Sequence, residues 1–187
     1  IEISPSRDFK ELISVSGQTQ AADENTATLV AEGLTPNSFY YYRVKVEGEV
    51  ASEVKTFTTY ASEGKSGNFS VIFGGGAAYI PWQHYMWSTI NAHNPDALFL
   101  MGDNVYIDYP ERPQVQRYCY HRRQSESHFR RLVGHTPVYA VWDDHDFGDN
   151  DDYGTPSLDT PAWKPTVLET FKDQWVDPGY GNQGELP

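Results

Sequence analysis

The stretch Ala97-Leu98-Phe99-Leu100-Met101-Gly102-Asp103-Asn104-Val105-Tyr106 decides the fold of this chain. A continuous apolar run that ends in glycine and polar residues is typical of a strand in a buried parallel sheet. The pattern returns at Val138-Tyr139-Ala140-Val141, which leads into Trp142-Asp143-Asp144-His145-Asp146. We therefore predict two buried parallel strands, each followed by an acidic cluster in a loop.

The segment between these strands, Pro113–Val133, is rich in helix formers. It is long enough for the crossover that a parallel pair of strands requires, so the unit is predicted as strand, helix, strand. In open parallel sheets, ligands bind beyond the carboxyl ends of the strands. We expect Asp103 and the residues around Asp144 to meet there.

Carboxylates gathered at neighbouring strand ends repel one another unless a cation lies among them. Carboxylate, carbonyl and phenolate oxygens suit calcium, magnesium, manganese or ferric iron, and imidazole extends the choice to zinc. A metal of this kind polarises a phosphoryl group or lowers the pKa of bound water. The clusters therefore favour hydrolysis of a phosphoester.

The two clusters resemble the second and third metal motifs of the alkaline phosphatase D family of metallophosphoesterases. The resemblance runs from about Phe69 to the end of the chain and includes Tyr118–Gln124 and Val176–Gly181. It implies an α/β metallophosphoesterase-type core, a partial β-sandwich flanked by helices, with residues 69–187 as the N-terminal half of that domain. It also implies metal-dependent hydrolysis of phosphomonoesters or phosphodiesters by the complete chain, with a small phosphoester as substrate.

The resemblance also implies roles for individual residues at a binuclear metal site, with calcium and iron as one metal pair. Asp103 matches the carboxylate that bridges the metals, and Tyr106 matches a phenolate ligand of ferric iron. Asn150 and Asp144 match positions that serve the second metal. Catalysis is expected to involve His145, which faces the phosphate, and Asp144. The expected substrate-binding residues are Asn104, Arg122 and Arg123.

The first motif of that family commonly supplies a cysteine ligand, but here Phe69–Phe73 leads into Gly74–Ala78. The single cysteine, Cys119, falls in the predicted helix, so other divalent metals remain compatible with the site. The family's later aspartate and histidine ligands have no counterpart before Pro187. We expect this sequence to be a fragment of a longer polypeptide.

The amino end resembles part of a fibronectin type III domain. Residues 33–46 resemble its penultimate strand, with Tyr40 placed like a corner tyrosine, and Val54–Thr59 would form the final strand. Alternation predicts that Tyr40, Tyr42, Val44 and Val46 share an apolar face. We thus expect a partial all-β, fibronectin-like or immunoglobulin-like domain over residues 1–60, a polar linker over 61–68, and the α/β core over 69–187.

The net charge of −12 at pH 7 argues against a surface for nucleic acid or anionic membranes. We expect no membrane span, because no stretch reaches the roughly 18 consecutive apolar residues that a spanning helix needs. The fibronectin-like segment and the family resemblance imply an extracytoplasmic location. Buried helix faces are predicted from helical spacing at two sets of residues, Trp82, Tyr85, Met86, Thr89, Ile90 and His93, and Val167, Leu168, Phe171 and Trp175.

Three other interpretations of the clusters remain open. In a purely structural one, Asp143 caps a turn and Asp144 pairs with an arginine. In another, the chain is a non-catalytic secreted binding or structural protein that keeps the phosphoesterase scaffold. The third is a related metallohydrolase with a different ester substrate. An EF-hand at Asp149–Thr160 is rejected, because its twelfth position lacks the bidentate glutamate.

Overall fold

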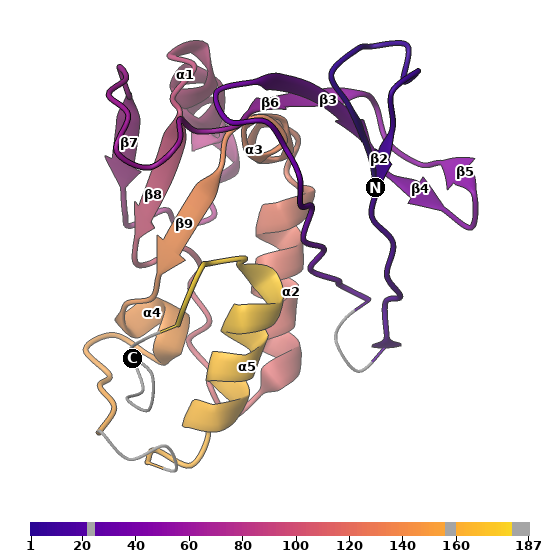
Figure 1. Ribbon diagram of the computed structural model, residues 1–187. Helices are drawn as coiled ribbons and strands as arrows, with labels where there is room; N and C mark the ends of the chain where they lie inside the picture. The colour runs from indigo at the N-terminus through magenta and orange to yellow at the C-terminus, as the bar shows by residue number, and fades with distance from the viewer. Residues whose placement is uncertain (22–24, 156–159, 181–187) are drawn as a thin grey trace. The chain divides into compact units, whose positions relative to one another are not determined.

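The computed structural model describes residues 1–21, 25–155 and 160–180. It divides the chain into two compact units, Ile1–Phe69 and Ser70–Pro187 (Figure 1). The boundary follows the predicted linker at residues 61–68. None of the helices in the described ranges has the length and apolar character that a membrane span needs.

The first unit is built from antiparallel strands. Its main sheet has the order β2-β1-β3-β6, and β4 and β5 form a separate hairpin. The bounds are β1 Glu2–Ser4, β2 Ile13–Ser14, β3 Phe39–Arg43, β4 Lys45–Val46, β5 Glu49–Val50 and β6 Lys55–Thr58.

Tyr40, which was expected at a corner position, makes contacts with β6 and with the turn before β3. Tyr40 is buried on β3, and its ring stacks on Phe57 of β6 with the centroids 5.6 Å apart. The Thr35 N–H donates to the Tyr40 hydroxyl oxygen over 2.9 Å, which ties the strand to the preceding turn. The assignment of this unit to the fibronectin type III class stays a prediction.

The apolar alternation predicted through Val46 is wrong beyond Arg43. The strand is interrupted at Val44, whose N–H donates to the Ser52 hydroxyl oxygen over 2.8 Å and not to a neighbouring strand. Val46 then enters the short β4–β5 hairpin and is 57% exposed. A side-chain acceptor therefore competes successfully with the sheet for the backbone donor at this position.

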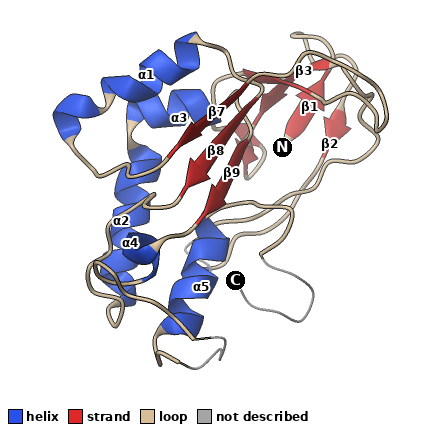
Figure 2. Cartoon of the chain, turned by 90° about the vertical axis from the view of Figure 1, so that its left-hand side faces the viewer, coloured by secondary structure: helices blue, strands red, loops and turns tan. Residues whose placement is uncertain are grey.

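The second unit contains the predicted parallel sheet, with the order β7-β8-β9. Figure 2 shows its helices along one face of that sheet. The strands are β7 Val71–Gly74, β8 Ala97–Met101 and β9 Val138–Val141. The helices are α1 Tyr85–Ala92, α2 Pro113–Ser125, α3 Ser127–Val133, α4 Asp144–Phe147 and α5 Lys164–Gln174, with a short 3₁₀ helix, η2, at Pro81–Gln83.

The core lies between that sheet face and the helices. Strand residues of one parity, including Leu98, Leu100 and Ala140, are buried there. The predicted stripe on α5 is confirmed, since Val167, Leu168, Phe171 and Trp175 are all buried. Residues brought by the other helices are Trp87 of α1, Cys119 and Tyr120 of α2, and Phe129 and Leu132 of α3. Burial of this apolar area is the main stabilising contribution to the unit.

The side chains of these strands alternate between a buried and an exposed face of the sheet, although the strand sequences are almost entirely apolar. Phe73, Phe99 and Tyr139 point to the other face, where their rings stack with centroid distances of 5.2 and 5.1 Å. On that face Phe73 is 62% exposed and Met101 53%. The prediction of fully buried strands is therefore wrong for one face, because the helices of this unit cover only the other.

Two helix predictions also need correction. The single helix predicted over Pro113–Val133 is two helices, because Glu126 adopts an extended conformation and its carboxylate accepts the N–H of Phe129 over 2.8 Å, which begins α3 anew. In α1 the buried residue is Trp87, and Met86 and Ile90 of the predicted face are partly buried against the core, whereas Tyr85 is 66% exposed. Trp82 lies before this helix, in η2, and is 78% exposed. The predicted buried face of α1 is therefore confirmed only in part.

Candidate metal centre

Three of the predicted side chains meet beyond the carboxyl ends of β8 and β9. Asp103 lies in the loop after β8, and Asp144 and His145 begin α4 directly after β9. One potential ligand atom from each of these three residues lies within 4.8 Å of the others. The crossover topology therefore brings together side chains that are distant in sequence, as predicted.

The backbone at the end of β8 allows this approach. Gly102 has a φ of 96°, a value open to glycine, and a β-carbon placed there would lie 2.5 Å from the Asp143 β-carbon. The next residue, Asp103, also has a positive φ, 52°, which is uncommon for a residue with a side chain. Local backbone strain of this kind concentrates at functional sites.

The carboxylate of Asp103 has capacity left for a cation. Its Oδ2 accepts the Tyr106 hydroxyl over 3.1 Å. Its Oδ1 is buried and has no hydrogen-bond partner among the described residues. A buried carboxylate oxygen without a donor is costly, so the atom fits a site in which a metal ion supplies the missing partner.

The carboxylate of Asp144 is held by backbone donors. It accepts the Asp151 N–H over 2.7 Å and the N–H of His145 over 3.0 Å. These bonds, the Asp151 N–H first, hold the pKa of Asp144 below its ordinary value, and the nearby His145 adds to the effect. Asp144 is therefore ionised near neutral pH, as a ligand for a hard cation must be.

Tyr106 and His145 stack beside the two carboxylates, with ring centroids 4.1 Å apart. Burial, followed by the hydrogen bond to Asp103, raises the pKa of Tyr106 to about 12, so the phenol is protonated and donates. The Nδ1 atom of His145 lies 3.7 Å from Oδ1 of Asp108, a residue that the sequence did not single out. This distance is too long for a hydrogen bond, and His145 Nδ1 has no such partner among the described residues.

The remaining predicted ligand, Asn150, lies on the acidic loop and is exposed. Its Nδ2 donates to Asp151 Oδ2 over 2.7 Å. Asn150 adjoins the residue whose N–H binds Asp144, so the loop that carries it is attached to the cluster.

Of the predicted substrate-binding residues, Arg123 and Asn104 are buried and Arg122 is half-buried. Arg123 is only 2% exposed, and its guanidinium donates to the Ala77 carbonyl and lies over Trp87, 5.1 Å from the ring centroid. Burial lowers the pKa of Arg123 to about 10. Arg122 lies over the Tyr79 ring at 4.2 Å. The side chain of Asn104 is buried and donates to the Val141 carbonyl over 2.8 Å.

Asp143 has the capping role that the structural interpretation gave it. It is the N-cap of α4 and forms a capping box with Asp146, in which each side chain accepts a backbone N–H at the other residue. The D-x-x-D spacing is a signal in the sequence that could have predicted this box. Asp143 thus shapes the helix that carries Asp144 and His145.

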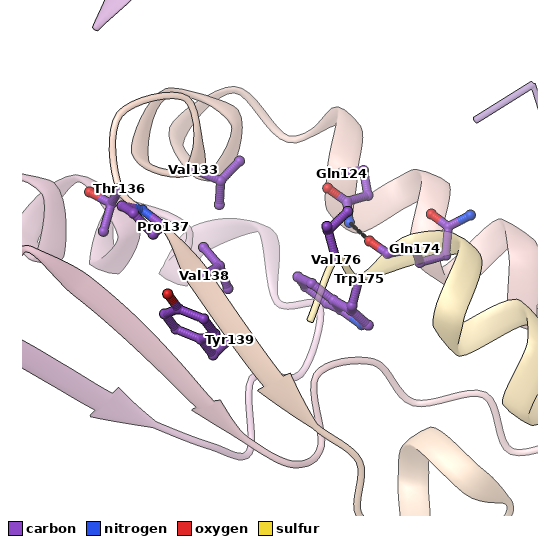
Figure 3. A pocket seen from close by; sticks show the side chains of 9 residues that line it. All are labelled: Gln124, Val133, Thr136, Pro137, Val138, Tyr139, Gln174, Trp175 and Val176. Atoms are coloured by element: carbon purple, nitrogen blue, oxygen red, sulfur yellow. Dashed lines mark hydrogen bonds between the residues drawn. The ribbon is translucent and has the colours of Figure 1, made fainter. Parts of the chain in front are cut away.

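A cavity of 340 Å³ lies at the opposite end of β9, away from the carboxylates (Figure 3). Its walls include Pro137 and Val138 on one side and Trp175 on another, and Gln124 Nε2 donates to the Gln174 carbonyl over 3.3 Å. The cavity is therefore separate from the carboxylate cluster.

Comparison with solved structures identifies the architecture. The structure of PhoD, alkaline phosphatase D, superposes with a TM-score of 0.81 at 18% sequence identity, over 100% of this chain and 40% of that protein. The fold is a phosphoesterase-like α/β fold. The structure of the purple acid phosphatase PPD1 from yellow lupin (Lupinus luteus) seeds gives a TM-score of 0.57 at 15% identity, over 96% of this chain and 36% of that one.

The chain therefore spans less than half the length of either protein. No protein-family profile matches the sequence, and no curated protein sequence matches it. The likeness to PhoD is one of fold, found through structure at low sequence identity.

Proposed function

We propose that this chain is part of a metal-dependent phosphoesterase that hydrolyses phosphomonoesters or phosphodiesters. The observation that carries the proposal is the cluster of Asp103, Asp144 and His145 beyond two parallel strands of a PhoD-like fold. The unpartnered Oδ1 of Asp103 favours a cation at this cluster over a purely structural role for the acidic residues.

Asp103 and Asp144 supply carboxylate oxygen atoms, and Tyr106 is proposed to add its oxygen atom after losing its proton to solvent when the ion binds. These donors suit a hard divalent or trivalent ion, including the pair of calcium and iron that the family resemblance implied. Such an ion, when bound, supplies Lewis-acid activation of the phosphoryl group or of water. Asn150 is proposed as a further ligand through its amide oxygen, and an extracytoplasmic location remains part of the proposal.

Side chains of the protein are proposed to stabilise the phosphoryl group, to orient a ligand and to attract the substrate. His145 belongs to the cluster, and its ring is proposed to stabilise a phosphoryl oxygen or to give a proton to the leaving group. Before an ion binds, Tyr106 keeps its proton, and its hydroxyl donates to Asp103 and holds that carboxylate in one orientation. Arg122, which lies beside Tyr79, is proposed to attract the anionic substrate.

The test is hydrolysis of p-nitrophenyl phosphate and bis(p-nitrophenyl) phosphate by the full-length protein, with bound metals measured on the same sample. Asp103→Asn is expected to remove metal and activity together. Asp8→Asn makes the same chemical change at an exposed ion pair in the other unit and should alter neither. Full activity and full metal content in Asp103→Asn would contradict the proposal.

A non-catalytic binding role is the alternative, favoured because the loop directly after β7, residues 75–80, contains no cysteine. In that case the wild-type protein would bind metal or phosphate without turning over either ester. The two substrates also separate monoesterase from diesterase activity.

A further inference from the structure

The buried carboxylate of Asp146 lies beneath the candidate metal centre and has no role in the proposed function. Asp146 is fully buried, within the same α4 turn as Asp144 and His145. Carboxylates are rarely buried to this extent unless hydrogen bonds compensate the lost hydration. Neighbouring donors must therefore compensate the hydration that the Asp146 carboxylate has lost.

Backbone N–H groups from two separate segments converge on this carboxylate. Asn104 N donates to both oxygens over 3.0 and 3.1 Å, and Val105 N donates to Oδ1 over 3.1 Å. Asp143 N donates to Oδ2 over 3.1 Å. One side chain thus connects the loop after β8 to the start of α4, across 42 residues of sequence.

The side chain of Asn104 completes the connection. Its Nδ2 donates to Asp146 Oδ2 over 3.2 Å and to the Val141 carbonyl over 2.8 Å, so it also joins the end of β9. The loop after β8, the end of β9 and the start of α4 are therefore joined at one buried point. Removing a buried acceptor of this kind leaves several donors without partners.

The loop after β8 is also hydrogen-bonded to the loop after β7. Gly76 N donates to the Gly102 carbonyl over 3.2 Å, and Ala77 N donates to the carbonyl of Asp103 over 2.9 Å. The loop after β7 thereby holds Asp103 and Gly102, and Asp146 holds the two residues that follow Asp103. Its positive φ is maintained by these fixed neighbours, because an isolated loop would relax to a commoner conformation.

We propose that Asp146 is a positioning residue for the metal site, setting the distance between Asp103 and the pair Asp144 and His145 without touching the ion. This inference rests on the proposed metal site. Residues that orient metal ligands typically change metal affinity by about 10–100-fold when substituted. A residue that serves only the fold would change stability and leave affinity unchanged.

The experiment is calorimetric titration of the metal-depleted full-length protein with Mn²⁺ or Ca²⁺, well below the melting temperature. Asp146→Asn keeps the size of the side chain but replaces one acceptor oxygen by an NH₂ group that faces donors. We expect its Kd for the ion to rise about 10–100-fold. Leu168→Ala, in the core on α5, is the matched control, since it lowers stability and should leave the Kd unchanged.

A second measurement needs no variant. Hydrogen exchange should show protected amides at Asn104 and Val105 in the metal-free wild type, because Asp146 binds them before any ion does. Exchange as fast as in an open loop would overturn the inference, and so would an unchanged Kd in Asp146→Asn. A wild-type protein that binds neither ion would instead refute the proposed metal site on which the inference rests.

Discussion

Gly102 and Asp103 have left-handed backbone angles for different reasons. Gly102 must be glycine because the chain passes close to Asp143, whereas Asp103 keeps its side chain for the cluster and is held by neighbouring hydrogen bonds. At the residue scale, the site therefore depends as much on backbone contacts as on its ligands.

Gly102→Ala should be more destabilising than the same change at Gly76. Gly76 has a φ of 66°, and no heavy atom lies near an added β-carbon. Gly76→Ala should therefore cost only the strain of a left-handed backbone conformation, about 1–2 kcal/mol. Gly102→Ala adds a clash with Asp143, worth about 1–3 kcal/mol more. Urea unfolding of both variants measures the difference, and equal losses would contradict the role given to the close approach.

Glu126 is a second residue whose conformation decides local structure. Glu126→Ala should lower the free energy of unfolding by about 1 kcal/mol, because the N–H of Phe129 loses its cap. Glu126→Gln keeps an acceptor oxygen and should lose less. Urea denaturation at neutral pH compares the two, and an equally large loss in the glutamine variant would assign the effect to the charge near His84.

At the scale of elements, β9 is the edge strand of the described sheet and is capped by a side chain. Ala140 N donates to Asp177 Oδ1 over 3.0 Å, and Asp177 Oδ2 is buried without a partner among the described residues. Burial raises the pKa of Asp177 above its ordinary value, even though the Ala140 N–H acts in the opposite direction. Burial therefore disfavours the charged form of this cap.

Asp177→Asn should be at least as stable as the wild type at neutral pH. The amide oxygen still accepts the Ala140 N–H, and no charge is buried. Because the pKa is raised in the folded state, the contribution of Asp177 is fully present below its unfolded pKa and is lost as the pH rises through the folded value. Denaturation curves from about pH 3 to about pH 7 should therefore diverge with rising pH. Parallel curves would refute this.

The sequence predicted the elements whose signals are local. Continuous apolar runs marked β8 and β9, and parallel pairing followed from the segment between them, so Asp103 and Asp144 could be expected to meet. The break at Glu126 was missed because an extended residue between two helix-forming segments leaves no clear pattern. Asp146 was missed because, in a run of acidic residues, composition cannot distinguish a buried acceptor from a surface charge.

At the scale of the whole molecule, the two units differ in what a metal ion would do to them. The candidate ligands all belong to Ser70–Pro187, and none belongs to Ile1–Phe69 among the described residues. An ion that binds the folded second unit stabilises that unit by mass action, by about 2.7 kcal/mol when its concentration is 100 times the Kd.

Scanning calorimetry should therefore show one transition that moves upward with added metal and one that does not. The moving transition belongs to the second unit and should lose its response in Asp103→Asn, while Asp8→Asn keeps it. A single transition that shifts as a whole would mean that the two units unfold together.

The parallel pairing of β8 and β9 also fixes when the site can form. Asn104 and Asp146 are 42 residues apart, and the intervening chain must close a long loop and dock α2 and α3 before the two strand ends become neighbours. Before that event, the candidate ligands after β8 and those after β9 are connected only by a flexible chain, so they are rarely close to one another. A nascent or partly folded polypeptide consequently has no site to offer, and capture of an ion would report that folding of the second unit is complete.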